Sequence, residues 1–223
     1  MSDALTQRLA QCRACPRLAS YLDDIRGRWP DYHARPVPAF GAPAPRLLIV
    51  GLAPGLHGAH RTGRPFTGDH AGILLYQTLH RYGFASRASS LSADDGLVLH
   101  DCRITNAVKC VPPQNAPTPA EARTCNRYLA EELQALTCVR VILALGAVAH
   151  RAALAALGER AAGRIFAHGA RHVLPDGRIL FDSYHCSRYN TQTRRLSADS
   201  FAAVFAAVRA ELDAVPRTTD DGR

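Results

Sequence analysis

Four short apolar runs predict the strands of a buried sheet. They occupy residues 47–50, 103–108, 139–145 and 179–183. Each run is short and rich in aliphatic or β-branched side chains, which favours a buried strand over a helix. A PDG turn ahead of the last run predicts a short hairpin over residues 173–181.

Longer segments with apolar side chains at helical spacing lie between and after these strands. We expect helices over residues 72–82, 118–136, 147–157 and 199–212. The second opens with Thr118, Pro119 and Glu121, the pattern of a capping box with proline in the first turn. The alternation of strands and helices predicts one α/β domain around a mostly parallel sheet of about four strands. We expect this domain to span residues 1–213, with a polar, flexible tail at residues 214–223.

Composition and charge narrow the class of protein. The chain has 223 residues, 47% of them hydrophobic, yet no apolar run is long enough to cross a bilayer. The N-terminal residues lack the apolar segment of a secretion signal, so we expect a cytoplasmic protein, and a monomer by default. A formal net charge of +8 favours a polyanionic partner such as a nucleic acid, although abundant arginine and alanine also fit a GC-rich genome.

The cysteines indicate a metal site. In a cytoplasmic protein the seven cysteines are poor candidates for disulfides. Cys12 and Cys15 form a CxxC pair. Cys110 follows a predicted strand, and Cys125 lies in the first turns of a predicted helix. Four such thiolates fit either zinc or a [4Fe–4S] cluster, and the alternative is a reduced surface pair. Cys102 and Cys138 flank or enter predicted strands and suit small core positions. Cys186 follows His185, and no residue near it in the sequence reads as the partner that would activate a catalytic thiol.

A glycine-rich segment after the first strand is the first candidate for chemistry. It reads GLAPGLHGAHRTGRPFTGD and matches neither the P-loop nor the dinucleotide-binding template. It does offer Phe66, whose ring can stack on a planar base, close to the carboxylate of Asp69. The structural alternative is that Phe66 belongs to the core and that Asp69 caps the helix beginning near Gly72.

Two further segments follow the second and fourth strands, where ligands of parallel sheets bind. ITNAVKC places Asn106 near a strand end, where its amide can pair with one edge of a pyrimidine or satisfy local backbone. YHCSRYN offers His185, which can donate a hydrogen bond to a departing group or bind a metal, and Ser187, which can hold a phosphate. A single histidine is more often merely packed or solvated.

Together these segments resemble the iron–sulfur uracil-DNA glycosylases of the type B, or family 5, branch. The resemblance rests on GLAPGLHGAHRTGRPFTGD, ITNAVKCVPP, YHCSRYNTQT and the cysteine pattern, and it extends from Cys12 to about Leu196. It implies a three-layer α/β/α fold and removal of uracil from DNA, the start of base excision repair. It also implies a wider range that includes hypoxanthine and some alkylated or etheno bases. It makes four residues the ligands of a structural [4Fe–4S] cluster: Cys12, Cys15, Cys110 and Cys125.

The resemblance also implies roles within the site. Phe66 would stack on a flipped base, Asn106 would bond its Watson–Crick edge, and His185 would donate to a base oxygen as negative charge develops. Asp69 would orient water or stabilise the cationic sugar. The expected pocket wall includes Gly51, Ala53, Pro54 and Gly55. The expected DNA contacts are Arg61, Arg64, Ser187, Arg188, Tyr189 and Asn190, with Arg188 or Tyr189 filling the gap left by the base.

Two positions depart from related sequences. The type A branch has an acidic residue immediately after the first glycine of the loop, where this chain has Leu52 followed by Ala53. The expected carboxylate therefore moves to Asp69, at the far end of the loop. Cys186 stands where relatives commonly have proline, which puts the rigidity of that loop in question.

Two other classes of protein share some of these features. A non-catalytic nucleic-acid-binding module with a four-cysteine zinc site would share the charge and the cysteines, and a redox protein would use the cluster for electron transfer. Neither needs the combination of Phe66, Asp69, Asn106 and His185. Colour separates the metals, because an iron–sulfur protein is brown and a zinc protein is colourless.

Overall fold

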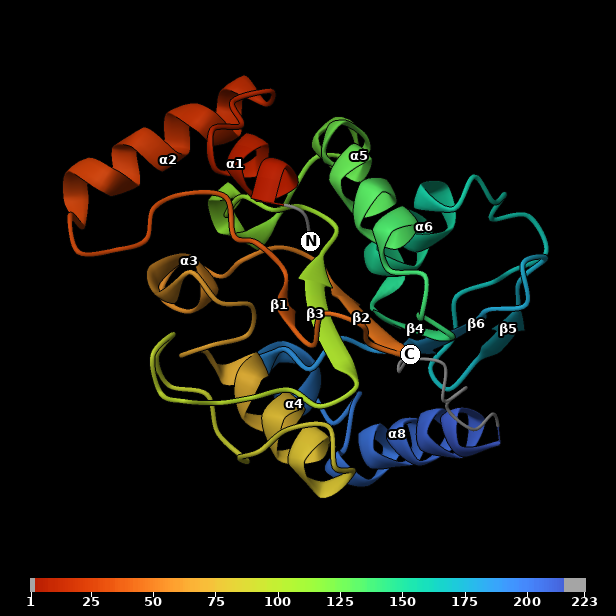
Figure 1. The fold of residues 1–223 in the computed structure, drawn as a ribbon. Helices are drawn as coiled ribbons and strands as arrows, with labels where there is room; N and C mark the ends of the chain where they lie inside the picture. Colours follow the sequence, from red (N-terminus) through yellow and green to blue (C-terminus); the bar gives the residue numbers. More distant parts are fainter. Residues whose placement is uncertain (1–2, 215–223) are drawn as a thin grey trace, which may run out of the picture.

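A single six-stranded sheet forms the centre of the protein (Figure 1), in the strand order β1-β3-β2-β4-β6-β5. The computed structural model describes residues 3–214. The four central strands are parallel: β2 (Leu47–Gly51), β3 (Cys102–Asn106), β4 (Val141–Leu145) and β6 (Ile179–Ser183). The edge strands β1 (Phe40–Gly41) and β5 (Arg171–Val173) pair antiparallel with β3 and β6.

The four predicted strands are therefore the parallel centre of the sheet, and the predicted hairpin is β5–β6. The sheet is two strands wider than expected. The two edge strands could not be recognised in the sequence as strands of their own, because they are only two and three residues long and β5 has no buried residue.

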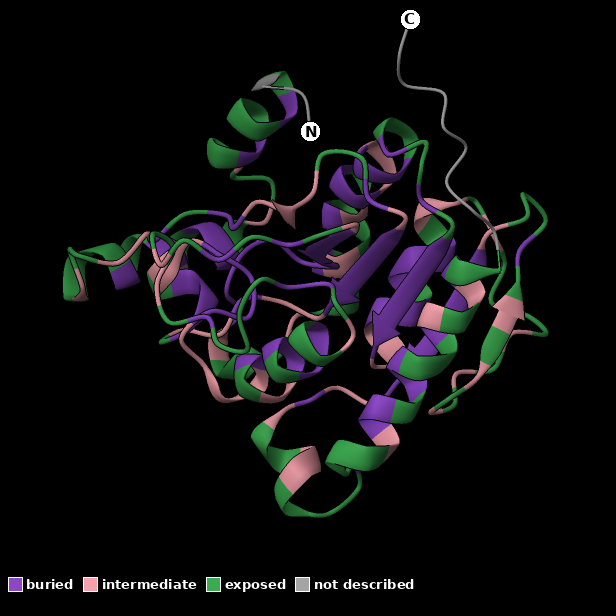
Figure 2. Ribbon diagram, turned by 60° about the horizontal axis from the view of Figure 1, so that its bottom comes forward, coloured by how far each residue is buried: buried purple, intermediate pink, exposed green. Residues whose placement is uncertain are grey.

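Helices cover both faces of the sheet (Figure 1). Alternate residues of β2 face opposite ways: Leu47 and Ile49 pack against α4 (His70–Arg81) and α8 (Ala198–Asp213), while Leu48 and Val50 pack against α5 (Pro119–Ala135) and α6 (Ala147–Ala156). Burial on both faces explains the continuous apolar runs. Figure 2 shows the resulting buried centre and the exposed outer surfaces of the helices. This is the expected three-layer arrangement.

The remaining helices are short or lie at the N-terminus. Helices α1 (Asp3–Ala10) and α2 (Pro16–Arg28) pack beside α5 in a third apolar cluster, which includes Leu18, Leu22 and Tyr128. Neither helix was predicted from the sequence. The other short elements are α3 (Ala59–Thr62), a 3₁₀ turn (Pro113–Asn115) and α7 (Arg188–Gln192).

Local signals in the sequence are reproduced closely. Thr118 Oγ1 accepts from Glu121 N at 3.2 Å, and Thr118 N donates to Glu121 Oε2 at 2.7 Å, which is the predicted capping box at the start of α5. Within residues 3–214, no helix is long and apolar enough to cross a membrane. The expected flexible tail lies, apart from Ala214, outside the described residues.

Candidate active site

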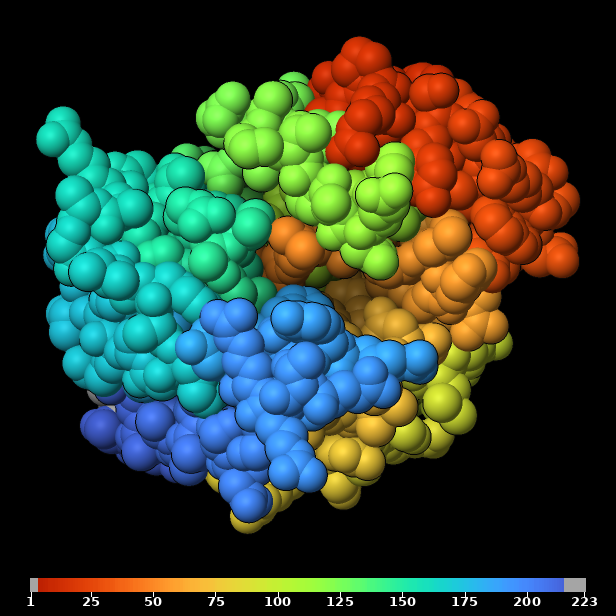
Figure 3. All heavy atoms as spheres, turned by 180° about the vertical axis from the view of Figure 1, so that it is seen from behind, coloured from red at the N-terminus to blue at the C-terminus, as the bar shows by residue number. Residues whose placement is uncertain are grey.

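The segments that leave the parallel strands meet at one edge of the sheet. The chain leaves β2 at Gly51 and β3 at Asn106, and His185 follows β6 by two residues. Figure 3 shows a hollow on this face, bordered by the orange segment after β2, the green segment after β3 and the blue segment after β6. The carboxyl edge of a parallel sheet is where ligands bind in such folds.

Asn106 and Phe66 converge on Gly51. A Cβ placed on Gly51 would lie 2.4 Å from Asn106 Oδ1 and 2.6 Å from Phe66 Cζ, so both side chains lie directly against its backbone. Asn106 is 3% exposed, and its Oδ1 has no hydrogen-bond partner in the described part of the chain. A buried acceptor without a partner is costly, which marks it as a position for a ligand donor.

Phe66 lies between the core and His185. It is 5% exposed and belongs to the apolar cluster beneath α4, so the core interpretation is correct. Its ring also stacks on the imidazole of His185, with centroids 5.7 Å apart and planes 29° from parallel. Burial lowers the pKa of His185 to about 4, so its ring is neutral at pH 7. The Phe66 carbonyl lies so close to Gly72 that any Cβ there would approach it to 1.9 Å.

Asp69 caps α4 and still presents a second oxygen. Its Oδ1 accepts from Gly72 N at 2.9 Å, so the capping interpretation is correct. Its Oδ2 faces the glycine-rich loop, 3.5 Å from the position of a Cβ on Gly55 and 2.5 Å from one on Gly58. Burial raises the pKa of Asp69 above that of an ordinary aspartate. The capping bond uses Oδ1, so capping does not exclude a second role for Oδ2.

The backbone continues the sheet pairing into the loop. Ala107 N donates to Gly51 O at 2.9 Å and Val108 N donates to Leu52 O at 3.0 Å, which holds the two strand ends side by side. Pro54 is buried, whereas Ala53 packs against the N-terminal apolar cluster. Ala53 therefore contributes to the support of the loop.

Arg64 differs from the expectation that it contacts DNA. Its side chain is buried and donates to Thr67 Oγ1 at 2.9 Å, Ser90 Oγ at 2.6 Å and Asp95 Oδ2 at 2.6 Å. The guanidinium also lies over the Phe40 ring. The guanidinium N–H groups are used inside the protein, so Arg64 connects the glycine-rich loop to residues 90–95. They are therefore not available for a phosphate.

The other expected DNA contacts surround the site. Arg61 and Arg188 line one groove together with Asp69. Ser187 caps α7, and Asn190 Nδ2 donates to the His185 carbonyl at 2.8 Å, which fixes the segment that carries the histidine. Tyr189 is 70% exposed.

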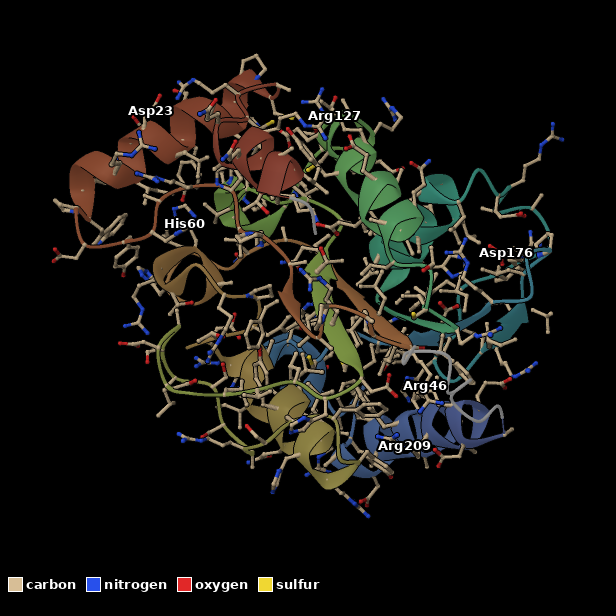
Figure 4. All side chains as sticks on the ribbon, in the orientation of Figure 1. Asp23, Arg46, His60, Arg127, Asp176 and Arg209 are labelled. Atoms are coloured by element: carbon tan, nitrogen blue, oxygen red, sulfur yellow. The ribbon has the colours of Figure 1, made fainter. Side chains whose placement is uncertain are left out.

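The four cysteines expected to bind a metal line one small cavity. Cys12 and Cys15 come from the segment between α1 and α2, Cys110 follows β3, and Cys125 lies in α5. All four are free thiols. Burial raises the pKa of the Cys125 thiol to about 11, and Lys109 N donates to Cys125 Sγ at 3.3 Å. Arg127, also on α5 (Figure 4), donates to Cys12 Sγ at 3.6 Å.

A buried ion pair near Asn106 and the cysteines was not predicted from the sequence. Lys109 Nζ donates to Glu132 Oε1 at 2.8 Å, and Thr105 Oγ1 donates to Glu132 Oε2 at 2.7 Å. The side chains of Lys109 and Glu132 are 0% and 1% exposed. The available signal was the single lysine of the chain, placed at the end of an apolar strand.

Comparisons with known proteins show which family this chain is similar to. The family model described as "Uracil DNA glycosylase superfamily" matches residues 38–209. A type-5 uracil-DNA glycosylase of Thermus thermophilus is 49% identical over 207 residues, covering 91% of this chain and 94% of the relative. One of Mycobacterium tuberculosis is 43% identical over 205 residues, covering 88% of this chain and 76% of the relative. A type-4 uracil-DNA glycosylase of Thermotoga maritima is 31% identical over 150 residues, 67% of this chain and 64% of the relative.

Proposed function

Because the chain belongs to the uracil-DNA glycosylase superfamily, we propose that it hydrolyses the N-glycosidic bond of uracil in DNA and so begins base excision repair. Identity of 41–49% to several type-5 enzymes, over about nine tenths of the chain, supports uracil excision. DNA is then its substrate, and the cytoplasm is its place of action.

The observation that carries this proposal is the unpaired Asn106 Oδ1 beside Phe66. Uracil presents an N–H donor next to a carbonyl acceptor on its Watson–Crick edge, so one carboxamide pairs with both groups. Cytosine presents a lone pair at the same nitrogen and an amino group at the neighbouring carbon, which reverses the pattern. An Asn106 held with its Oδ1 toward the base therefore accepts from uracil and repels cytosine.

The same complementarity supports a wider substrate range. Hypoxanthine also presents an N–H next to a carbonyl, whereas adenine does not. We therefore include deaminated purines such as hypoxanthine in the proposal. The stacking surface of Phe66 is insensitive to base identity, since every base has a π-face.

Catalysis would divide between the base and the sugar. The target nucleotide leaves the stack and its base enters the pocket against Phe66. His185 is neutral near pH 7 and donates a hydrogen bond to a base oxygen as the departing base gains negative charge. The Oδ2 of Asp69 stabilises the cationic sugar or orients the attacking water. Arg61, Ser187, Arg188, Tyr189 and Asn190 stay as proposed contacts to the flanking DNA.

We also propose that Cys12, Cys15, Cys110 and Cys125 hold a structural [4Fe–4S] cluster. The fit is chemical, because four thiols from three chain segments line one cavity and a backbone N–H donates to one of them. When bound, the cluster would cross-link the N-terminal helices to β3 and α5. The purified protein should be brown and contain iron and sulfide, and a colourless zinc protein would contradict this assignment.

The test is a glycosylase assay with a monomeric preparation of the protein. Duplexes containing uracil, hypoxanthine, xanthine or ethenocytosine are incubated with it, and abasic sites are then cleaved with alkali. We expect cleavage at uracil and at hypoxanthine, and none in the matched cytosine or adenine duplex. Binding without release of any base would instead favour the non-catalytic module, and reversible reduction without base release would favour the redox protein.

A further inference from the structure

Three potential metal ligands meet on the β5 side of the sheet, beneath α6. They are His150 in α6, His172 in β5 and Asp182 in β6. Asp182 Oδ1 lies 2.8 Å from His150 Nδ1, and its Oδ2 lies 3.0 Å from His172 Nε2. All the potential ligand atoms lie within 4.8 Å of one another. The cluster shares no residue with the proposed glycosylase site.

The contact between His150 and Asp182 can be bridged by a proton or by a metal ion. Asp182 is 0% exposed, and within residues 3–214 its ion pairs are with these two histidines. His150 Nε2 lies 3.0 Å from the Arg164 carbonyl, which can only accept, so Nε2 carries a hydrogen. In a neutral imidazole Nδ1 then carries a lone pair, and it faces a carboxylate oxygen at 2.8 Å. Two acceptors at this distance require a proton or a metal ion between them.

We propose that His150 Nδ1, His172 Nε2 and Asp182 bind a divalent metal ion, with zinc as the best match. Two imidazoles and one carboxylate are ligands that zinc takes in tetrahedral sites. Tetrahedral bonds of about 2.1 Å separate neighbouring ligand atoms by about 3.4 Å. The 2.8 Å and 3.0 Å contacts of the histidines with Asp182 would therefore widen by about 0.6 Å and about 0.4 Å, and all the ligand atoms already lie within 4.8 Å of one another.

The surroundings supply two further elements of a metal site. The N–H of His150 Nε2 donates to a backbone carbonyl, which fixes the tautomer that presents Nδ1 as a ligand. The side chain of His172 is 13% exposed and borders a surface hollow with Gly163 and Arg164, which leaves room for water as the fourth ligand. The bound metal would cross-link the three-residue edge strand β5 to β6 and α6. The turn of this hairpin contains Asp176 (Figure 4).

Metal binding is tested on the full chain with its cysteine site loaded. After treatment with EDTA, Zn²⁺ is titrated by calorimetry and the melting temperature is measured with and without the ion. We expect one additional zinc equivalent and a rise in melting temperature. His172→Gln should weaken binding by at least tenfold and abolish the rise, because glutamine at this half-buried position removes the ligand nitrogen. His100→Gln, at an exposed histidine outside the cluster, should bind like the wild type.

Cobalt identifies the ligands. The difference spectrum on adding Co²⁺ should show visible d–d bands without the strong near-ultraviolet bands of a cobalt–thiolate bond. Asp182→Asn, which keeps the size of the side chain, should lose these bands and provides a second variant. Absence of binding, thiolate bands, or binding unchanged by His172→Gln would overturn the proposal and leave the three side chains as a hydrogen-bonded cluster.

Discussion

Asn106 Oδ1 lies directly against the backbone of Gly51, its register partner across the parallel pair β2–β3. A methyl group on Gly51 would approach Asn106 Oδ1 to 2.4 Å and Phe66 Cζ to 2.6 Å. The glycine that begins the loop is therefore required by close approach of two proposed base contacts rather than by flexibility. One position connects the proposed stacking surface with the amide that is proposed to read the base.

Gly51→Ala should consequently impair excision. Both neighbours must move, and displacements of this size at a reacting centre cost about 100-fold in rate. Single-turnover excision of uracil measures the loss, and fluorescence anisotropy measures DNA binding, which should change little. Gly27→Ala is the control, because a Cβ there meets nothing within 4 Å. Normal excision by Gly51→Ala would show that the pocket adapts and that the observed contacts are not needed.

Asn106→Ala tests the amide itself. The substitution removes both polar contacts to the base edge and leaves the stacking ring in place. Loss of hydrogen bonds at a site that recognises polar groups costs about 1–3 kcal/mol each, so excision of uracil should fall by at least tenfold. Parallel assays on uracil, hypoxanthine and cytosine duplexes measure the excision rates and the base preference. Unchanged rates and unchanged base preference would reduce Asn106 to a structural residue.

Asp69→Asn separates the observed helix cap from the proposed catalytic role of this side chain. Asparagine is as good a helix N-cap as aspartate, so the variant keeps the bond to Gly72 N and loses the charge. We expect single-turnover excision to fall by about 100-fold or more while the melting temperature stays nearly unchanged. Asp69→Ala should in addition lose about 1 kcal/mol of stability with the cap. Near-normal excision by Asp69→Asn would remove this carboxylate from the chemistry.

The parts of the fold that the sequence predicted depend on local patterns. The apolar runs of the central strands and the capping box at Thr118 each lie within a few consecutive residues. Asp69 shows the limit of that approach. The sequence offered capping and catalysis as alternatives, and only the geometry shows that its two oxygens face different partners.

Long-range partners explain what the sequence could not predict. Arg64 appeared as one more loop arginine, because its partners Ser90 and Asp95 follow it by 26 and 31 residues. The contact of Lys109 with Glu132 spans 23 residues, and β5 is recognisable only through its pairing with β6. In each case a polar or short segment acquires its role from residues that a local pattern does not include.

Acidification should destabilise the protein through buried histidines. His60, in α3 (Figure 4), is 0% exposed, and burial lowers its pKa from 6.5 to about 4. The unfolded chain therefore binds the proton more tightly, so this contribution is present above pH 6.5 and is lost as the pH falls toward 4. Between pH 7 and pH 5 the loss is about 2 kcal/mol for this one residue. Burial of His185 acts in the same direction.

Urea unfolding at pH 7 and pH 5 measures this effect. His60→Phe keeps an aromatic ring and removes the titrating group, so its free energy of unfolding should fall less on acidification than that of the wild type. His100→Gln, at an exposed histidine, should behave like the wild type. Equal losses in the wild type and His60→Phe would contradict the assignment.

The buried pair Lys109–Glu132 should be the most sensitive polar contact outside the site. Lys109 stands between Asn106 and Cys110, so the pair supports the segment that joins the proposed base-reading amide to the cysteine cavity. Glu132→Leu leaves the lysine charged, buried and unpaired, which should cost about 3–5 kcal/mol. Its neighbour Glu131 offers the matched control, because it pairs with Arg8 at the surface and Glu131→Ala should change stability by less than about 1 kcal/mol.

The double variant Lys109→Met, Glu132→Leu distinguishes charge from packing. Replacing both partners with apolar side chains removes the uncompensated charge, so most of the lost stability should return. Urea unfolding of the single and double variants gives the coupling energy, and uracil excision by the double variant reports on Asn106. If stability returns but excision does not, the ion pair positions the amide as well as stabilising the fold. If both return, apolar packing at these positions is sufficient to hold the end of β3 in place.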